Sequence, residues 1–314
     1  MVHISAKKTR RRVPRALKVQ GLGARQIAAL AKDAGVAWTN DGAASMGAAI
    51  AYYTIFSIAP LLIIAIAVAG FFFGAEAAQG HIFAQARGFL GEEGAATLQG
   101  LIKSASAPAE GFVATAIGLA VMLFGATGVF GELQGAMDRI WQTPVKKGQS
   151  GVGYLIRRRV FTFGMVLAVA FLLLVSLAVS AVISAIQSVW SPADGAWELL
   201  FQAINFAVSF VIVAGLFALM FKLLPRVSVA WGDVLIGAVV TALLFNIGKF
   251  LIGLYIGKSG VVSGFGAAGT LIAMLLWVYY SAQIFLLGAE FTWVYAKRHG
   301  SMAGKVRASQ ADSP

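Results

Sequence analysis

Six long apolar stretches alternate along the chain with shorter segments that hold most of its charged residues. Each stretch is long enough to cross a hydrocarbon core about 30 Å thick, because roughly 20 helical residues span that distance. The pattern therefore predicts an all-α, polytopic membrane protein with six transmembrane helices. The expected spans are residues 46–73, 112–131, 160–186, 199–221, 234–257 and 264–296.

The composition of the 314-residue chain supports a lipid-exposed surface. Hydrophobic residues make up 59% of the chain and charged residues only 12%, and the mean hydropathy is +0.81. A soluble domain would have about a quarter of its residues charged, so much of this surface must face lipid. The chain contains no cysteine, which excludes disulfides and thiolate chemistry.

The distribution of positive charge predicts the orientation in the membrane. Most Lys and Arg residues fall in alternate connections, namely 1–45, 138–159, 222–226 and 297–307. The other connections hold only Arg87, Lys103 and Lys258. Because positive segments stay in the cytoplasm, both termini are expected there. The net charge of +12 then indicates a lipid bilayer with anionic headgroups as the partner, and no nucleic acid.

The chain is expected to form one membrane domain over residues 24–300. Basic residues 1–23 and the segment 301–314 are predicted to be disordered cytoplasmic tails. Residues 24–38 have the apolar spacing of a short amphipathic helix that lies in the interface. The outer connection 74–110 shows helical spacing in two short pieces and is expected to rest on the outer surface or cap the bundle.

The first span contains a proline and an aromatic pair. Pro60 removes a backbone donor in mid-span, so we expect it to kink the helix. Tyr52 and Tyr53 precede it on the cytoplasmic side, where an interfacial aromatic pair is the favoured interpretation.

Glycine spacing predicts close contacts between helices. Gly125, Gly128, Gly131 and Gly135 form a bare stripe at the end of span two, which favours the close approach of another helix. GxxxG pairs at 70/74 and 253/257 permit association between copies. A homo-oligomer is therefore compatible with the sequence, which does not fix the oligomeric state.

Motifs of soluble-type active sites are missing from the sequence. There is no G-x-x-x-x-G-K-[ST], H-E-x-x-H or G-x-S-x-G. The three histidines, His3, His81 and His299, are far apart, and no carboxylate–histidine cluster suits a two-metal nuclease site. The sequence predicts neither an enzyme nor a bound metal or cofactor.

Polar groups inside the spans are the remaining candidates for a functional site, because lipid rarely tolerates them without a role. If span five starts near Val234, Lys249 lies about 22 Å along the helix, in the outer half of the membrane. The same face is small or polar and is expected to point into the bundle or a wet cavity. The candidate intramembrane site consists of Lys249, Asn246, Asn205 and Thr241.

An anion is expected near Lys249. Glu110 and Glu198, at the outer starts of spans two and four, are candidate counter-charges, and an anionic ligand such as a lipid phosphate is the other candidate. A lysine that only fixes packing or reaches water is an equal alternative. A second polar group is expected at the cytoplasmic ends of the helices and comprises Glu132, Asp138, Arg139 and Glu290.

Three segments resemble the YihY/BrkB family of bacterial inner-membrane proteins: AAIAYYTIFSIAPLLIIAIAVAG, GELQGAMDRIW and GAAGTLIAMLLWVYYSAQIFLLGAEFTWVYA. The similarity covers about residues 25–300. It implies six spans, cytoplasmic termini, an inner-membrane location and, for some members, movement or handling of envelope lipids. Many relatives have Glu at the position of Asn246, so a Glu–Lys pair within this helix is lost here. The legacy family name, ribonuclease BN, is interpreted as a misassignment, and the missing nuclease motifs fit that interpretation.

Three functions follow from these observations. The favoured one is transport or handling of an anionic envelope lipid or small anion at a polar intramembrane site. The alternative is a non-transporting membrane scaffold, supported by the glycine stripe and the basic cytoplasmic surface. A membrane-bound ribonuclease is the weakest, because only the family label and the basic termini support it.

Overall fold

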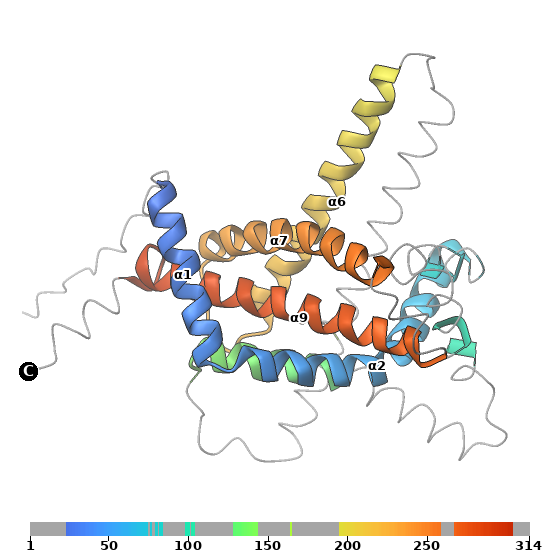
Figure 1. The fold of residues 1–314 in the computed structure, drawn as a ribbon, viewed down its shortest axis with the longest axis horizontal. Helices are drawn as coiled ribbons and strands as arrows, with labels where there is room; N and C mark the ends of the chain where they lie inside the picture. Colours follow the sequence, from blue (N-terminus) through green and yellow to red (C-terminus); the bar gives the residue numbers. More distant parts are fainter. Residues whose placement is uncertain are drawn as a thin grey trace, which may run out of the picture.

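The computed structural model describes residues 23–74, 128–143, 195–258 and 267–303, with isolated positions between 76 and 103 and at 164. Every regular element in these ranges is helical. A helix without a label covers residues 128–140. The five long helices are α1 (Ala24–Asn40), α2 (Ala43–Phe73), α6 (Gly195–Leu223), α7 (Trp231–Lys258) and α9 (Ala267–Arg298) (Figure 1).

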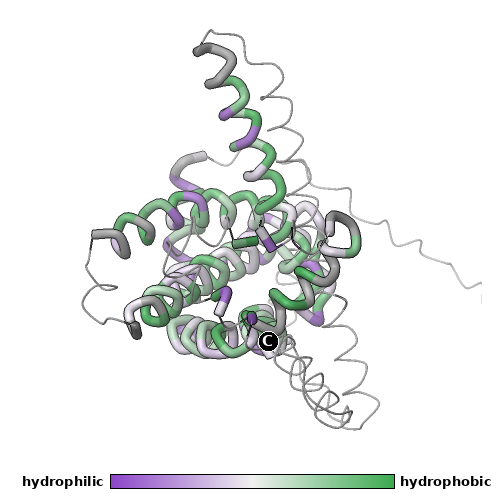
Figure 2. The backbone as a smooth tube through the Cα atoms, turned by 90° about the vertical axis from the view of Figure 1, so that its right-hand side faces the viewer, coloured by the Kyte–Doolittle hydropathy of each residue, from purple (hydrophilic) through white to green (hydrophobic). Residues whose placement is uncertain are grey.

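The helices confirm a helical membrane protein. Three segments are long and apolar enough to cross a membrane, namely Leu200–Leu223, Trp231–Ile252 and Leu271–Arg298. Figure 2 shows hydrophobic residues along most of each tube, with hydrophilic residues in short patches. The ends of α2, α6, α7 and α9 fall within four residues of four expected spans.

The count of six spans and the orientation of the termini stay predictions. The expected spans 112–131 and 160–186 lie almost entirely outside the described residues, as do most of the two predicted tails. The one-domain organisation and the disorder of those tails likewise remain expectations from the sequence.

Helix α9 occupies the centre of the bundle. It contacts α7, α2 and α1, and in Figure 1 it runs between α7 and α2. Helix α6 packs on α7, but its first half extends away from the other helices in both views. The helix 128–140 lies along α2, where a Cβ at Gly128 would contact Tyr53 and Ser57. That glycine therefore serves the close helix contact expected of the stripe.

The largest hydrophobic core lies where residues 128–143, α6, α7 and α9 meet. Its fully buried side chains include Met137, Ile140, Phe221 and Leu286. The ring of Phe221 of α6 packs at a tilt against that of Phe285 of α9, with 5.3 Å between ring centroids. Inside a membrane such a core stabilises the fold by close packing rather than by exclusion of water.

Helices α7 and α9 approach closely because a glycine faces a threonine twice. Gly237 lies against Thr292, and Gly288 lies against Thr241; a Cβ at either glycine would overlap the threonine side chain. Each threonine Oγ1 donates a hydrogen bond of 2.7 Å to the carbonyl four residues earlier in its own helix. We call these four residues the Gly–Thr clasp. It satisfies both hydroxyls and lets the two backbones meet.

Helix α1 docks on the end of α9. Leu30 and Ala34 are buried against Phe291 and Tyr295. In Figure 1 α1 crosses the ends of α7 and α9. This crossing is the arrangement expected of a helix that lies in the membrane interface while its neighbours span the bilayer.

A two-residue corner, Asp41 and Gly42, joins α1 to α2. Gly42 has φ +68°, in the left-handed region that glycine adopts without steric cost. From this corner α2 continues through Pro60 as one helix to Phe73, so the kink expected at Pro60 stays a prediction. Tyr52 and Tyr53 are both exposed, and their rings meet edge to face at 5.6 Å.

The described part of the outer connection packs on the second half of α2. Leu98 and Ile102 are buried in a small cluster with Ile66 of α2, and Ile82 and Phe83 pack against that cluster. These contacts tie the connection to the bundle.

Candidate functional site

Lys249 lies in the second half of α7, on an exposed side of the helix. Ile247, Phe250 and Leu251 next to it are also exposed, Phe250 by 68%. Gly248 instead faces α9, where a Cβ would overlap Tyr280 and Ile284. The lysine therefore stands beside the α7–α9 contact, at the edge of an apolar outer surface.

The other residues of the predicted intramembrane site lie in different environments. Thr241 is fully buried in the Gly–Thr clasp. Asn246 is half-buried, and its Nδ2 donates to the carbonyl of Ala242 at 2.8 Å. Asn205 is exposed on the first half of α6. The small residues Ala238 and Ala242 are buried, so one part of the predicted face points inward while Lys249 does not.

The side chains of both candidate counter-charges lie outside the described part of the chain. Glu110 lies outside the described residues, and Glu198 lies in the first turn of α6 with a side chain that is likewise outside them. Their pairing with Lys249 stays a prediction.

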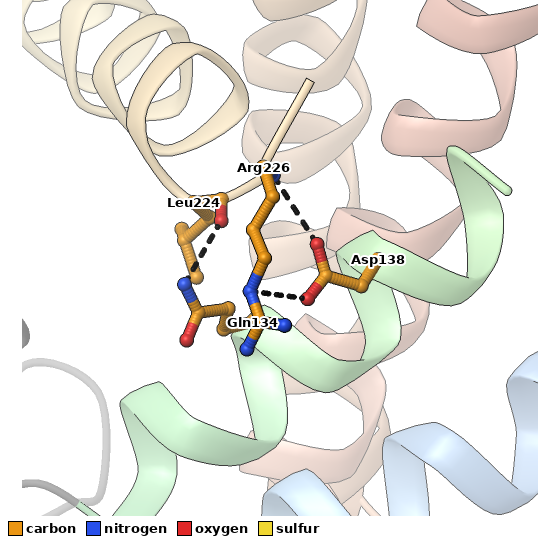
Figure 3. Close-up of polar contacts among 4 residues, drawn as sticks. All are labelled: Gln134, Asp138, Leu224 and Arg226. Carbon is orange, nitrogen blue, oxygen red and sulfur yellow. Dashed lines mark hydrogen bonds and ion pairs between the residues drawn. The ribbon is translucent and has the colours of Figure 1, made fainter. Parts of the chain in front are cut away.

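The predicted polar group at the helix ends contains one well-formed ion pair. Asp138 binds Arg226 of the α6–α7 linker twice, through Nε at 3.1 Å and through the backbone N–H at 3.2 Å (Figure 3). Gln134, one turn earlier, donates to the carbonyl of Leu224 at 3.4 Å. These contacts hold the linker on the helix 128–140, so Asp138 has a structural role.

Arg139 and Glu132 of the same helix lie close to α2. The guanidinium of Arg139 reaches the corner between α1 and α2, where a Cβ at Gly42 would lie 3.8 Å from its Nη2. Glu132 is half-buried, seven residues earlier in the helix. A spacing of seven residues returns to the same helix face, so both side chains share the face that lies along α2.

Glu290 is the most unusual polar residue of the described structure. Its side chain is fully buried, and neither carboxylate oxygen has a hydrogen-bond donor in the described part of the chain. The carboxyl group of Asp41 lies beside it, and Lys297 is also within electrostatic range. A buried carboxylate without donors is costly, which marks this position for a function other than packing.

Aromatic rings and Lys297 surround the end of α9 near Glu290. Trp293 packs against Trp141 with 5.2 Å between ring centroids, and Lys297 Nζ lies 4.0 Å from the centroid of the Trp293 ring. The same Nζ donates to Gln142 Oε1 at 3.4 Å. Lys297 is thus fixed by a cation–π contact and a hydrogen bond.

The sequence did not single out two polar residues, Asp233 and Asp41, that make contacts in the structure. Asp233 in the first turn of α7 is buried and accepts hydrogen bonds from the backbone N–H and Oγ of Ser301, at 2.9 and 2.7 Å. Asp41 was missed as the neighbour of Glu290. The Asp-Gly pair at 41–42 is a turn signal that could have pointed to Asp41. An acidic residue in the first turn of a helix is common, so Asp233 carried no comparable signal.

Among the described residues no group of three or more His, Cys, Asp or Glu side chains could hold a metal ion.

Comparison with known proteins decides the family. Residues 36–313 match the family model described as virulence factor BrkB. The chain belongs to the BrkB family. This confirms the resemblance that the three sequence segments indicated. No solved structure matches the chain.

Relatives within the BrkB family are named UPF0761 membrane proteins. One from Stenotrophomonas maltophilia (strain K279a) is 26% identical over 257 residues, which cover 78% of this chain and 55% of that protein. One from Pseudomonas aeruginosa (strain LESB58) is 28% identical over 261 residues, covering 80% and 59%. One from Tolumonas auensis is 36% identical over 84 residues, covering 26% and 28%. The chain thus spans little more than half the length of the first two relatives.

Proposed function

We propose that this BrkB-family chain moves or handles an anionic envelope lipid, or a small anion, in the bacterial inner membrane. The site of contact is the face of α7 that carries Lys249. The single observation behind the proposal is the exposed position of Lys249 within a helix apolar enough to span the membrane.

An anionic lipid suits this surface because it has both a charged headgroup and apolar acyl chains. Its phosphate matches the lysine ammonium, and its acyl chains match the exposed side chains of Ile247, Phe250 and Leu251. A charged side chain at membrane depth is costly and usually marks a substrate or ion pathway. Because this chain spans little more than half of the Stenotrophomonas and Pseudomonas relatives, the activity of a whole protein of this type is part of the proposal.

The experiment compares Lys249→Met with Lys249→Arg in protein reconstituted into lipid vesicles. Transbilayer movement is measured with fluorescent phosphatidylglycerol and fluorescent phosphatidylcholine, and flux of chloride and phosphate is measured in parallel. We expect Lys249→Met to abolish movement of the anionic species and Lys249→Arg to retain it. The matched control is Lys103→Met, an exposed lysine outside the three described spans, which should behave as the unmodified protein.

The outcome separates the candidate substrates and can reject the site. Movement of phosphatidylglycerol without inorganic flux would assign a lipid, and the reverse would assign a small anion. Normal movement in a folded Lys249→Met variant would remove Lys249 from the pathway. Lipid analysis of a deletion strain gives the cellular counterpart, because the lipid that accumulates on one side identifies the substrate.

A non-transporting scaffold is the second candidate. Its support is the first half of α6, which extends from the bundle (Figure 1) and exposes large apolar side chains, Leu200 by 48% and Phe206 by 61%. Such a surface suits contact with another membrane helix. A stable homo-oligomer in native-like nanodiscs that is lost in Phe206→Ala, with no flux in any assay, would favour the scaffold.

A further inference from the structure

Glu290 lies in the interior of the bundle without hydrogen-bond donors. Its exposed fraction is 0%, and both carboxyl oxygens lack a donor among the described residues. An ionised carboxylate in such a place pays a large desolvation cost unless donors or cations compensate for it. A protonated carboxyl avoids that cost and can itself donate a hydrogen bond.

The neighbour of Glu290 is a second carboxyl group. Asp41, in the corner between α1 and α2, is close enough for a side-chain hydrogen bond with Glu290. Two carboxylates offer only acceptors to each other, so this bond requires a proton on one of them. A proton shared between two adjacent carboxyl groups is a familiar arrangement, because like charges at close range cannot both be ionised cheaply.

The basic groups around the pair hold other partners or lie towards the surface. Lys297 of α9 attracts Glu290 but is fixed on Trp293 and Gln142. Arg139 of the helix 128–140 reaches Gly42 from an exposed position.

The other acidic groups on the helices packed around α9 have partners or lie on another face. Asp33 of α1 pairs with Arg298, Asp138 with Arg226, and Asp233 of α7 binds Ser301. Glu132, half-buried on the helix 128–140, faces α2. None of these four has the combination seen at Glu290, which is full burial together with an adjacent carboxyl.

We propose that Glu290 and Asp41 form a proton-binding site that controls the docking of the α1–α2 corner on α9. With one proton bound, the two carboxyl groups share a hydrogen bond and hold the corner against α9. With the proton released, two negative charges face each other in an environment of low dielectric constant and repel. The corner then moves away from α9 and takes the end of α1 with it.

The arrangement of the helices couples movement of this corner to movement of α1. Only Asp41 and Gly42 join α1 to α2, and α1 contacts α9 through Leu30 and Ala34. In Figure 1 the corner and the docked helix α1 lie at the same end of the bundle as the end of α9. Lys249 lies on α7 and is not part of the proton site, so this proposal does not depend on the function proposed for Lys249.

The first test detects the proton itself. Infrared difference spectra of the full chain in nanodiscs, recorded from mildly acidic to mildly alkaline pH, should show a protonated carboxyl band that disappears as pH rises. We expect Glu290→Gln to remove this band and Glu132→Gln, the matched control, to leave it. A spectrum in which Glu290→Gln changes no carboxyl band would overturn the proposal.

The second test measures docking and uses the absence of cysteine from the chain. An Ala34→Cys substitution places a thiol in the α1–α9 contact and keeps Leu30, whereas Val36→Cys places one on the exposed side of α1, where the native valine is 52% exposed. Maleimide reacts with the thiolate, so labelling of any accessible cysteine accelerates with pH. The rate at position 34 is therefore divided by the rate at position 36 at each pH, and this ratio should rise as pH rises.

Adding Glu290→Gln or Asp41→Asn to Ala34→Cys should keep this ratio low and independent of pH, because the one remaining carboxyl group has no charged partner to repel it. A ratio that keeps its pH dependence in both double variants would refute the coupling. If the labelling rate at a fixed pH differs between sodium and choline buffers, the site binds a metal cation instead of a proton, and the proposal is also refuted. Both tests read the site without any transport assay, so their failure is distinct from failure of the proposed function.

Discussion

Thr241 of α7 and Gly288 of α9 lie so close together that the glycine has no room for a methyl group. The mirror contact between Thr292 and Gly237 repeats this relationship one turn away. Antiparallel helices that each carry a glycine four residues before a threonine can interlock in this way. The Gly–Thr clasp therefore fixes the register of α7 against α9.

Gly288→Ala should destabilise the protein. The added methyl group overlaps the side chain of Thr241, and overpacking of this kind costs about 1–3 kcal/mol. Unfolding in detergent titrations should reveal the loss. Gly135→Ala is the matched control, because a Cβ at that helical glycine meets nothing within 4 Å, and the change should be neutral or slightly stabilising.

Asp233→Ala should loosen the end of α9. The aspartate accepts two hydrogen bonds from Ser301, and bonds to a charged group contribute about 1.5–3 kcal/mol each. Hydrogen exchange of the backbone amide of Ser301 should accelerate. Ser301→Ala removes the hydroxyl bond alone and should have a smaller effect; equal effects would show that the backbone bond contributes nothing.

Arg226→Ala should release the α6–α7 linker while global stability changes little. The Arg226 side chain is 41% exposed, and exposed ion pairs contribute about 0–1 kcal/mol. Limited proteolysis at residues 224–230 should become faster. Arg25→Ala, on the exposed start of α1, should leave the cleavage rate unchanged, and an unchanged rate in Arg226→Ala would argue against the docking contact.

Leu30→Ala should undock α1 from α9. The leucine is fully buried against Phe291 and Tyr295, and truncation of a buried leucine costs about 2–5 kcal/mol. Amide exchange across α1 should rise while α7 and α9 keep their protection. Ile27→Ala, at a position 49% exposed on the same helix, is the comparison and should alter exchange only slightly.

The long helices could be predicted from the sequence because the length of each apolar stretch sets where the helix begins and ends. The expected spans at 199–221 and 234–257 correspond to α6 and α7 within a few residues, since a helix that crosses lipid must be apolar throughout. The amphipathic helix near residues 24–38 was also foreseen, because Leu30 and Ala34 have the helical spacing that places both in the contact with α9.

The polar contacts could not be foreseen in the same way. Asp41 meets Glu290, and Asp233 meets Ser301, only because α9 lies between elements distant in the chain. Hydrophobic pattern fixes which residues form a helix but not which helices become neighbours. The orientation of Lys249 could not be predicted for the same reason. Its helix was predicted, yet Gly248 rather than the lysine faces α9, because packing against Tyr280 and Ile284 sets the rotation of α7.

The two-residue corner at Asp41 and Gly42 has a mechanical consequence. A connection this short has no slack, so α1 and α2 behave as the two arms of a lever whose pivot is Gly42 in its left-handed conformation. A rotation of α2 about its long axis therefore either moves α1 or strains the corner. Movement of α2 is thereby transmitted to the contact that α1 makes with Phe291 and Tyr295 of α9.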